Sequence, residues 1–139
     1  MTAFTGLIAC VLCLLSMAYS AEASTQSVPD CKNELGSKAI QHHYIREKLA
    51  VGVIVAKNQI QGPVYTCEVE KRAYEFVRTT GPSHMIGKNV VYEQGTGKLN
   101  LNKVLRKWNG ELKNMGNKDK FGCNLSISGE GYKAVCVFE

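Results

Sequence analysis

The chain contains 139 residues, with 17 basic and 12 acidic side chains and a formal net charge of +5 at pH 7. This length predicts a single domain. Apart from one apolar run near the N-terminus, no segment approaches the length of a membrane-spanning helix, so we expect a soluble mature protein without a membrane span.

The first 20 residues predict a secretory signal peptide. They contain no Lys, Arg, Asp or Glu, and the apolar run at 7–19 is short for a bilayer span. Small residues in "AYSAEA" follow this run and fit a signal-peptidase site. We expect cleavage after Ser20 or, alternatively, after Ala23. The other interpretation of residues 1–20 is a buried N-terminal helix rather than a signal peptide. The chain then divides into a signal peptide (1–20), a flexible N-terminal arm (21–30) and one folded domain (31–139).

Four cysteines remain after removal of the signal peptide. An even number of cysteines in a secreted chain predicts two disulfide bonds, and four cysteines allow three pairings. None of them forms a C-x-x-C pair, and no histidine lies at zinc-ligand spacing from them. We therefore expect neither a metal site nor a cofactor. The four disulfide cysteines are Cys31, Cys67, Cys123 and Cys136.

The first part of the domain predicts a helix followed by strands. Residues 33–49 lack proline and carry apolar side chains at helical spacing, and Ser37 is an alternative, capped start of this helix. The β-branched segment 51–56 predicts a strand, which ends at 58–63. Residues 64–80 predict a long strand with a bulge or turn where the alternation shifts. The apolar helix positions are Ile40, Tyr44, Ile45 and Leu49.

The second part predicts a loop, a pair of strands, a helix and a hairpin. Residues 81–87 predict the loop, and 88–102 predict two strands around the Gly-rich turn "QGTG". Residues 101–115 predict an amphipathic helix, and 121–138 predict a hairpin joined by "SGEG". This order of elements indicates the α+β class. The apolar stripe of the second helix is Leu101, Val104, Leu105, Trp108, Leu112 and Met115.

One segment accounts for the whole net charge. Residues 98–120 hold seven basic and two acidic side chains, whereas the two signs balance in the rest of the chain. A basic patch attracts phosphate backbones, acidic membranes or acidic protein surfaces. The alternative is a solvated face that aids solubility. The candidate binding residues lie on the polar faces of the second predicted helix and are Lys103, Arg106, Lys107 and Lys113.

The histidines do not form a recognisable catalytic set. His42 and His43 are neighbours on the first predicted helix and point about 100° apart, so they do not converge on one substrate. His84 lies in the predicted loop, where a catalytic group can sit, but no nucleophile motif accompanies it. The segment "QGTGK" (94–98) lacks the spacing of a phosphate loop and predicts a hairpin turn. The motif "NLS", beginning at Asn124, has the form of an N-glycosylation acceptor.

Four features follow one another along the chain. Cys31 precedes the first predicted helix, and "AYEFVRTTG" (73–81) contains a central carboxylate, Glu75. "GKNVVYEQGTGKL" (87–99) and "YKAVC" (132–136) come next. In this order they resemble the N-terminal cysteine, the base-bearing strand, the arginine-bearing strand and the closing strand of small secreted guanyl-specific fungal ribonucleases. They are also similar to powdery-mildew effectors, the ribonuclease-like proteins associated with haustoria.

The resemblance implies an antiparallel sheet packed on a helix and closed by the terminal cysteines. It thereby implies the pairs Cys31–Cys136 and Cys67–Cys123, while a bond between Cys123 and Cys136 across the hairpin is the alternative. A second alignment takes "YTC" (65–67) as the tyrosine-x-cysteine signature of the effectors. That alignment places a helix at 68–79, which conflicts with the strand predicted there.

The catalytic set of the ribonucleases is incomplete in this sequence. Glu75 matches the general base, but Asn89 stands where the family has its arginine, and the last strand has no histidine to act as the acid. Lys88 and Lys133 supply charge, but a lysine of ordinary pKa is a poor proton donor at neutral pH. A lone general base contributes about 10²–10⁴ in rate. We therefore predict no catalytic residue and interpret Glu75 as a relic of a catalytic base or as a surface charge.

The sequence and the resemblance together predict a secreted, catalytically inactive, ribonuclease-like virulence effector of a fungus. It would bind host proteins or RNA as a monomer, and the resemblance further implies delivery into host cells and a host immune receptor as a partner. One alternative is an active ribonuclease that uses Glu75 and His84. The other is a basic, disulfide-stapled inhibitor or toxin that acts outside cells.

Overall fold

The computed structural model describes residues 27–79 and 89–139. The predictions for the signal peptide, for most of the N-terminal arm, for the loop at 81–87 and for His84 and Lys88 lie outside these residues. In chain order the elements are α2 (Lys32–Leu35), the 3₁₀ turn η1 (Gly36–Lys38), α3 (His43–Lys57), β1 (Val64–Tyr65), α4 (Cys67–Thr79), β2 (Val90–Thr96), α5 (Leu101–Asn114), β3 (Lys120–Ser128) and β4 (Gly131–Phe138).

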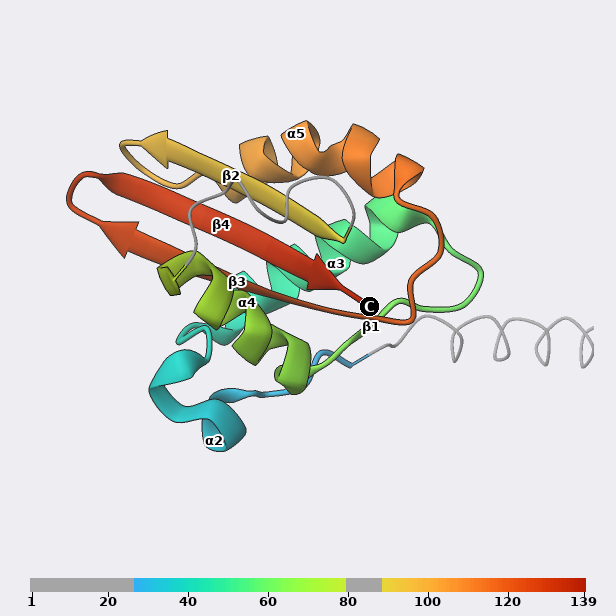
Figure 1. The fold of residues 1–139 in the computed structure, drawn as a ribbon, viewed down its shortest axis with the longest axis horizontal. Coiled ribbons are helices and arrows are strands. Elements are labelled where there is room, and N and C mark those ends of the chain that lie inside the picture. Colours follow the sequence, from blue (N-terminus) through green and yellow to red (C-terminus); the bar gives the residue numbers. More distant parts are fainter. Residues whose placement is uncertain (1–26, 80–88) are drawn as a thin grey trace, which may run out of the picture.

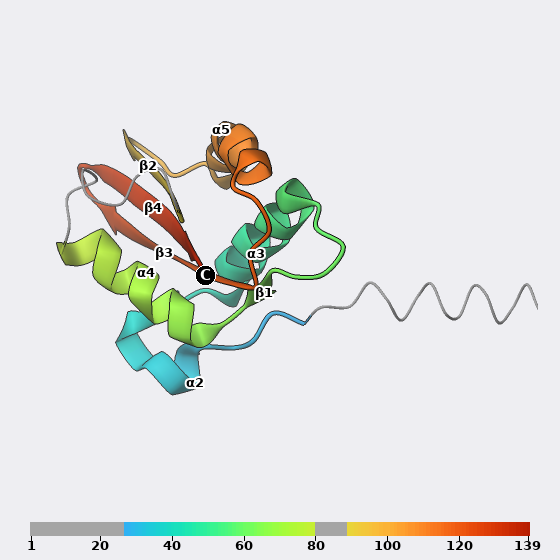
Figure 2. The same cartoon turned by 45° about the vertical axis from the view of Figure 1, so that its right-hand side comes forward.

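These elements form three layers, with the sheet in the middle (Figures 1 and 2). The strand order is β1-β3-β4-β2. Helix α4 packs on one face of the sheet, and α3 and α5 pack together on the other. The predicted α+β class and the two disulfides are confirmed. The predicted antiparallel sheet is wrong, because β1 pairs with β3 in parallel and the sheet is therefore mixed.

Alternating side chains of the sheet belong to two apolar clusters, one on each face. On β4, Ala134 and Cys136 belong to the cluster under α3 and α5, whereas Val135 and Val137 belong to the cluster under α4. Trp108, on α5, is among the largest fully buried side chains and anchors that helix on the sheet. The polar face of α5 therefore stays on the outside of the molecule.

The first predicted helix is displaced, and the strand predicted at 51–56 is wrong. Helix α3 runs over His43–Lys57 and includes the whole β-branched segment. Leu49, Ala50 and Val53 are fully buried at helical spacing, so packing outweighs the preference of valine for strands. Gly52 lets the neighbouring helix approach, because a Cβ there would lie 2.5 Å from a methyl group of Leu105.

The long strand predicted at 64–80 is also wrong. Only Val64–Tyr65 are extended, and Cys67–Thr79 form helix α4. Val69, Ala73 and Val77 recur every fourth residue and bury one side of this helix. The backbone of α4 lies so close to β3 that a Cβ on Gly122 would be 2.2 Å from the amide nitrogen of Glu70. The alternative alignment placed its helix at 68–79, which agrees with this observation.

The C-terminal half follows the predictions more closely. The second of the two strands predicted at 88–102 is absent from the structure, since β2 ends at Thr96 and α5 begins at Leu101. Asn100 caps α5 by accepting a hydrogen bond from the amide of Lys103, at 3.1 Å. The predicted amphipathic helix and terminal hairpin are both confirmed.

The disulfides connect Cys31 with Cys67 and Cys123 with Cys136, so the predicted pairs Cys31–Cys136 and Cys67–Cys123 are wrong. Cys123 and Cys136 face each other in the register of β3 and β4, with a Cα–Cα distance of 4.0 Å. The hairpin itself brings them together, as the alternative prediction had it. The other bond fastens the segment before α2 to the first residue of α4.

Within the two described ranges, no helix is long and apolar enough to cross a membrane.

Candidate functional site

The residues matched to a ribonuclease site do not converge. Glu75 lies on the exposed side of helix α4, not on a strand, and α4 covers the face of the sheet opposite α3. His42 and His43 lie at the exposed start of α3. Asn89 accepts a hydrogen bond from Nζ of Lys118, at 2.6 Å. Glu75 and the two described histidines thus lie on helices that pack on opposite faces of the sheet.

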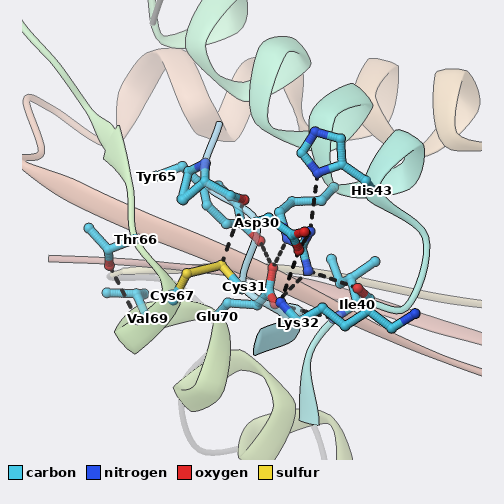
Figure 3. The surroundings of a disulfide bond; sticks show 12 residues. Asp30, Cys31, Lys32, Ile40, His43, Tyr65, Thr66, Cys67, Val69 and Glu70 are labelled. Atoms are coloured by element: carbon cyan, nitrogen blue, oxygen red, sulfur yellow. Dashed lines mark hydrogen bonds and ion pairs between the residues drawn. A yellow bond between two sulfur atoms is a disulfide. The ribbon is translucent and has the colours of Figure 1, made fainter. Parts of the chain in front are cut away.

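A buried ion pair, which the sequence analysis missed, joins Arg46 of α3 to Glu70 of α4. Figure 3 shows Glu70 near the Cys31–Cys67 disulfide. Nε of Arg46 lies 2.6 Å from Oε1 of Glu70, and Nη2 of Arg46 lies 3.2 Å from Oε2. Both side chains are almost completely buried. A two-point contact of this kind between Arg and a carboxylate is strong and fixes the orientation of both groups.

The same cluster joins several elements through backbone groups. The amide of Ile40 donates to Oε2 of Glu70, and Nη2 of Arg46 donates to the carbonyl of Ile40. The hydroxyl of Tyr65 donates to Oε1 of Glu70 at 2.5 Å and accepts from the amide of Cys123 at 3.2 Å. The cluster therefore ties the segment before α3 to α4, β1 and β3.

The ionisation of the cluster fits a structural role. Burial raises the pKa of Tyr65 well above its usual value, and the charge of Glu70 and its hydrogen bond raise it further. Burial alone would lower the pKa of Arg46, but the hydrogen bond and charge of Glu70 outweigh it and raise that pKa. A neutral phenol and a fixed ion pair sealed inside the fold stabilise it without reaching a substrate.

The predicted binding residues share one exposed surface of α5. Val104, Trp108 and Leu112 bury one side of the helix, which turns the basic side chains to solvent. Lys107 reaches across to β2, where its Nζ lies 2.9 Å from Oε1 of Glu93. This hydrogen bond and charge raise the pKa of Lys107. The four residues Lys103, Arg106, Lys107 and Lys113 form what we call the cationic face of α5.

A groove of about 800 Å³ runs between α3 and α5, beside the cationic face. Gly52, Val55 and Ala56 line it on α3. Nζ of Lys57 donates to the carbonyl of Gly116, which holds the end of α3 against the segment that follows α5. Burial lowers the pKa of Lys57, and the neighbouring charge of Lys118 adds to this effect. The lining residues contributed by α5 are Asn102, Leu105, Arg106, Asn109 and Lys113.

Exposed apolar side chains gather on α3 and on the segment after it. Val51 is 49% exposed and Val55 is 71% exposed on the outer side of the helix. Ile60 in the following loop is fully exposed. Of the six large hydrophobic residues exposed in the described chain, five lie between Tyr44 and Val64. On α3, Tyr44, Val51 and Val55 have helical spacing and form an apolar strip, and Val55 lines the groove together with Arg106 and Lys113 of the cationic face.

The described residues also bear on metal binding, which the sequence did not predict, and on the glycosylation motif at Asn124. Within residues 27–79 and 89–139, no three His, Cys, Asp or Glu side chains lie close enough together to hold a metal ion. Asn124 is only 3% exposed, and its side-chain amide donates to the carbonyls of Lys38 and Glu70. A glycan cannot be attached to this nitrogen in the folded protein.

Comparison with known proteins identifies the fold. The structure is similar to that of hookworm platelet inhibitor, with a TM-score of 0.56 and 15% identity over 74% of this chain and 75% of that one. It is also similar to manganese-bound Ac-ASP-7, with a TM-score of 0.52 and 19% identity over 75% of this chain and 72% of that one. Among curated proteins, none matches the chain.

The family model of the Ancylostoma-associated secreted protein related family matches residues 31–138, which is nearly the whole predicted domain. This match and the structural neighbours overturn the resemblance to fungal ribonucleases and mildew effectors, together with both ribonuclease functions that it implied. The segment "AYEFVRTTG", which carried the resemblance, is mostly helix rather than a base-bearing strand. The chain belongs to the Ancylostoma-associated secreted protein related family.

Proposed function

We propose that the protein is an extracellular binding protein, without catalytic activity, which recognises an acidic surface of another protein through the cationic face of α5. A secreted location is consistent with the family and with two disulfides, which persist in oxidising compartments. The predicted signal peptide points the same way. Of the interpretations considered from the sequence, an extracellular, disulfide-stapled inhibitor or toxin is the one that remains.

The observation that carries this proposal is that the cationic side chains of α5 lie together on its exposed side, opposite its buried apolar side. Four cationic side chains share its outer side, and among the described residues only Lys107 of the four forms an ion pair. Unpaired cations on one face speed the encounter with an acidic partner and select against basic ones. The adjoining apolar strip favours a protein partner, because protein interfaces combine apolar contacts with a charged rim.

The similarity to hookworm platelet inhibitor supports the proposal at the level of fold alone. That protein is named for inhibition, which binding proteins achieve by occupying a surface of their target. A shared fold does not transfer a target, since unrelated functions occupy the same fold. The chemistry of this chain's own surface therefore decides the class of partner.

A direct test is a binding screen of the mature protein against a panel of purified extracellular domains. The screen would run at about 50 mM and about 300 mM salt, because contacts between exposed charges weaken as salt screens them. We expect one or more acidic domains to bind at low salt and to bind much more weakly at high salt. Binding that salt leaves unchanged would contradict recognition through the cationic face.

A further inference from the structure

We infer that the groove between α3 and α5 receives an acidic amphipathic helix of the partner protein. The inference rests on the proposed function and adds the shape of the element that is recognised. An amphipathic helix that lays its apolar side into a groove is a recurrent mode of protein recognition. Three features of the groove favour this occupant over others.

The first feature is the difference between its two walls. The α3 wall is apolar and small, with Gly52, Val55 and Ala56. The α5 wall carries two cations, Arg106 and Lys113. An occupant that complements both walls needs an apolar side and an acidic side along one axis. A helix provides both, since its sides repeat every three to four residues.

The second feature is the close approach of the two helices that form the groove. Gly52 brings α3 so near α5 that the side chain of Leu105 fills the position of a Cβ there. Leu105 thus forms the floor between the helices. Because small residues line the α3 side, these two packed helices leave a furrow into which the ridge of a third helix fits.

The third feature is the set of amides along the groove. Asn58, Asn102 and Asn109 line it together with the apolar residues. Side-chain amides donate hydrogen bonds to the polar side chains of a protein and accept hydrogen bonds from them. Burying the same amides against lipid tails leaves these bonds unmade and carries an energetic penalty. An RNA or another polyanion would use the cations and leave Val55 without a contact. A protein helix uses all three kinds of group.

The experiment uses two synthetic peptide probes of identical composition, each stapled into a helix. The amphipathic probe carries leucines on one side and glutamates on the other, and its isomer distributes the same residues around the helix. Fluorescence anisotropy at about 50 mM salt measures the affinity of the mature protein for each. We expect the amphipathic probe to bind about tenfold more tightly, since burying one or two aliphatic side chains is worth this much.

Variants then locate the contact. Val55→Ser changes a side chain that lines the groove, so it should remove most of the preference for the amphipathic probe and leave the isomer unaffected. Val64→Ser is the matched control, because Val64 is 51% exposed and does not line the groove. It should leave the preference intact. Circular dichroism would confirm that both variants fold.

The outcomes separate this inference from the proposed function. If both probes bind equally and salt weakens both, the cationic face recognises charge alone and the groove inference is overturned. The same holds if acidic domains bind in the screen while neither probe binds. Val55-dependent binding to phosphatidylserine vesicles, without binding to either probe, would assign the groove to a lipid surface. Loss of salt-sensitive binding in every assay would overturn the proposed function as well.

Discussion

Replacement of Glu70 by alanine tests whether the buried cluster holds the fold together. The substitution leaves the guanidinium of Arg46 buried, with the carbonyl of Ile40 as its main remaining partner and Asp30 at 3.7 Å. Removal of one partner from a buried ion pair destabilises a protein by about 3–5 kcal/mol. We expect a loss of this size in urea unfolding, and a fall in melting temperature of about 10–20 °C.

A paired variant distinguishes an unpaired charge from lost packing. Arg46→Met combined with Glu70→Leu removes both charges and keeps apolar volume, which is often nearly neutral for a buried pair. The double variant should therefore be more stable than Glu70→Ala. The reasoning is refuted if Glu70→Ala loses less than about 1 kcal/mol, or if the double variant is the less stable of the two.

Three further predictions concern groups inside the fold. Because burial raises the pKa of Tyr65 well above its usual value of about 10, the phenol ionises at a lower pH in the unfolded chain than in the folded protein. The free energy of unfolding should therefore be highest below the unfolded pKa and should fall as the pH rises towards the folded pKa. Urea unfolding of Tyr65→Phe should show a smaller fall over this pH range. Peptide mapping should link Cys31 to Cys67, and Cys31→Ser with Cys67→Ser should lower stability by about 4 kcal/mol in the chain-entropy model. Mass spectrometry of protein secreted from a glycosylating host should find Asn124 without a glycan, and a fully glycosylated, stable product would contradict the burial of this side chain. Asn124→Ala should lower the free energy of unfolding by about 1–3 kcal/mol, because the carbonyls of Lys38 and Glu70 lose their donor.

Sequence reasoning succeeded where one pattern decides the structure locally. The stripe of α5 has helical spacing and no competing period, and its cap at Asn100 agrees with it. The hairpin of β3 and β4 could be predicted from its turn and its two β-rich segments alone. The cationic face was predictable for the same reason, because its residues lie on a helix whose buried side was already identified.

The same reasoning failed where tertiary packing decides between helix and strand. Residues 51–56 are β-branched, yet α3 continues through them because Val53 is buried and Gly52 packs against α5. Residues 67–79 alternate as a strand would at their start, although Val69, Ala73 and Val77 have helical spacing. The error at this second segment produced the ribonuclease resemblance.

The groove and the buried cluster could not be derived from those assignments. The groove requires α3 as a helix, since its apolar wall would point in two directions on a strand. The ion pair joins residues 24 positions apart on two helices. The available signal was Glu70 itself, which falls next to Val69 and one turn before Ala73 once the segment is seen as a helix.

The most direct test of the account is the effect of the cationic face on binding to an acidic domain found in the screen. The variant Lys103→Ala, Arg106→Ala and Lys113→Ala removes three cations, and Lys32→Ala, Lys71→Ala and Lys133→Ala is a matched control that removes three exposed lysines elsewhere. Surface substitutions of this kind each change stability by only about 0.5 kcal/mol or less, so both variants should fold. The account predicts that the first variant loses most of the affinity and of its salt dependence, whereas the control retains both. Equal affinities for the parent and the first variant would contradict it.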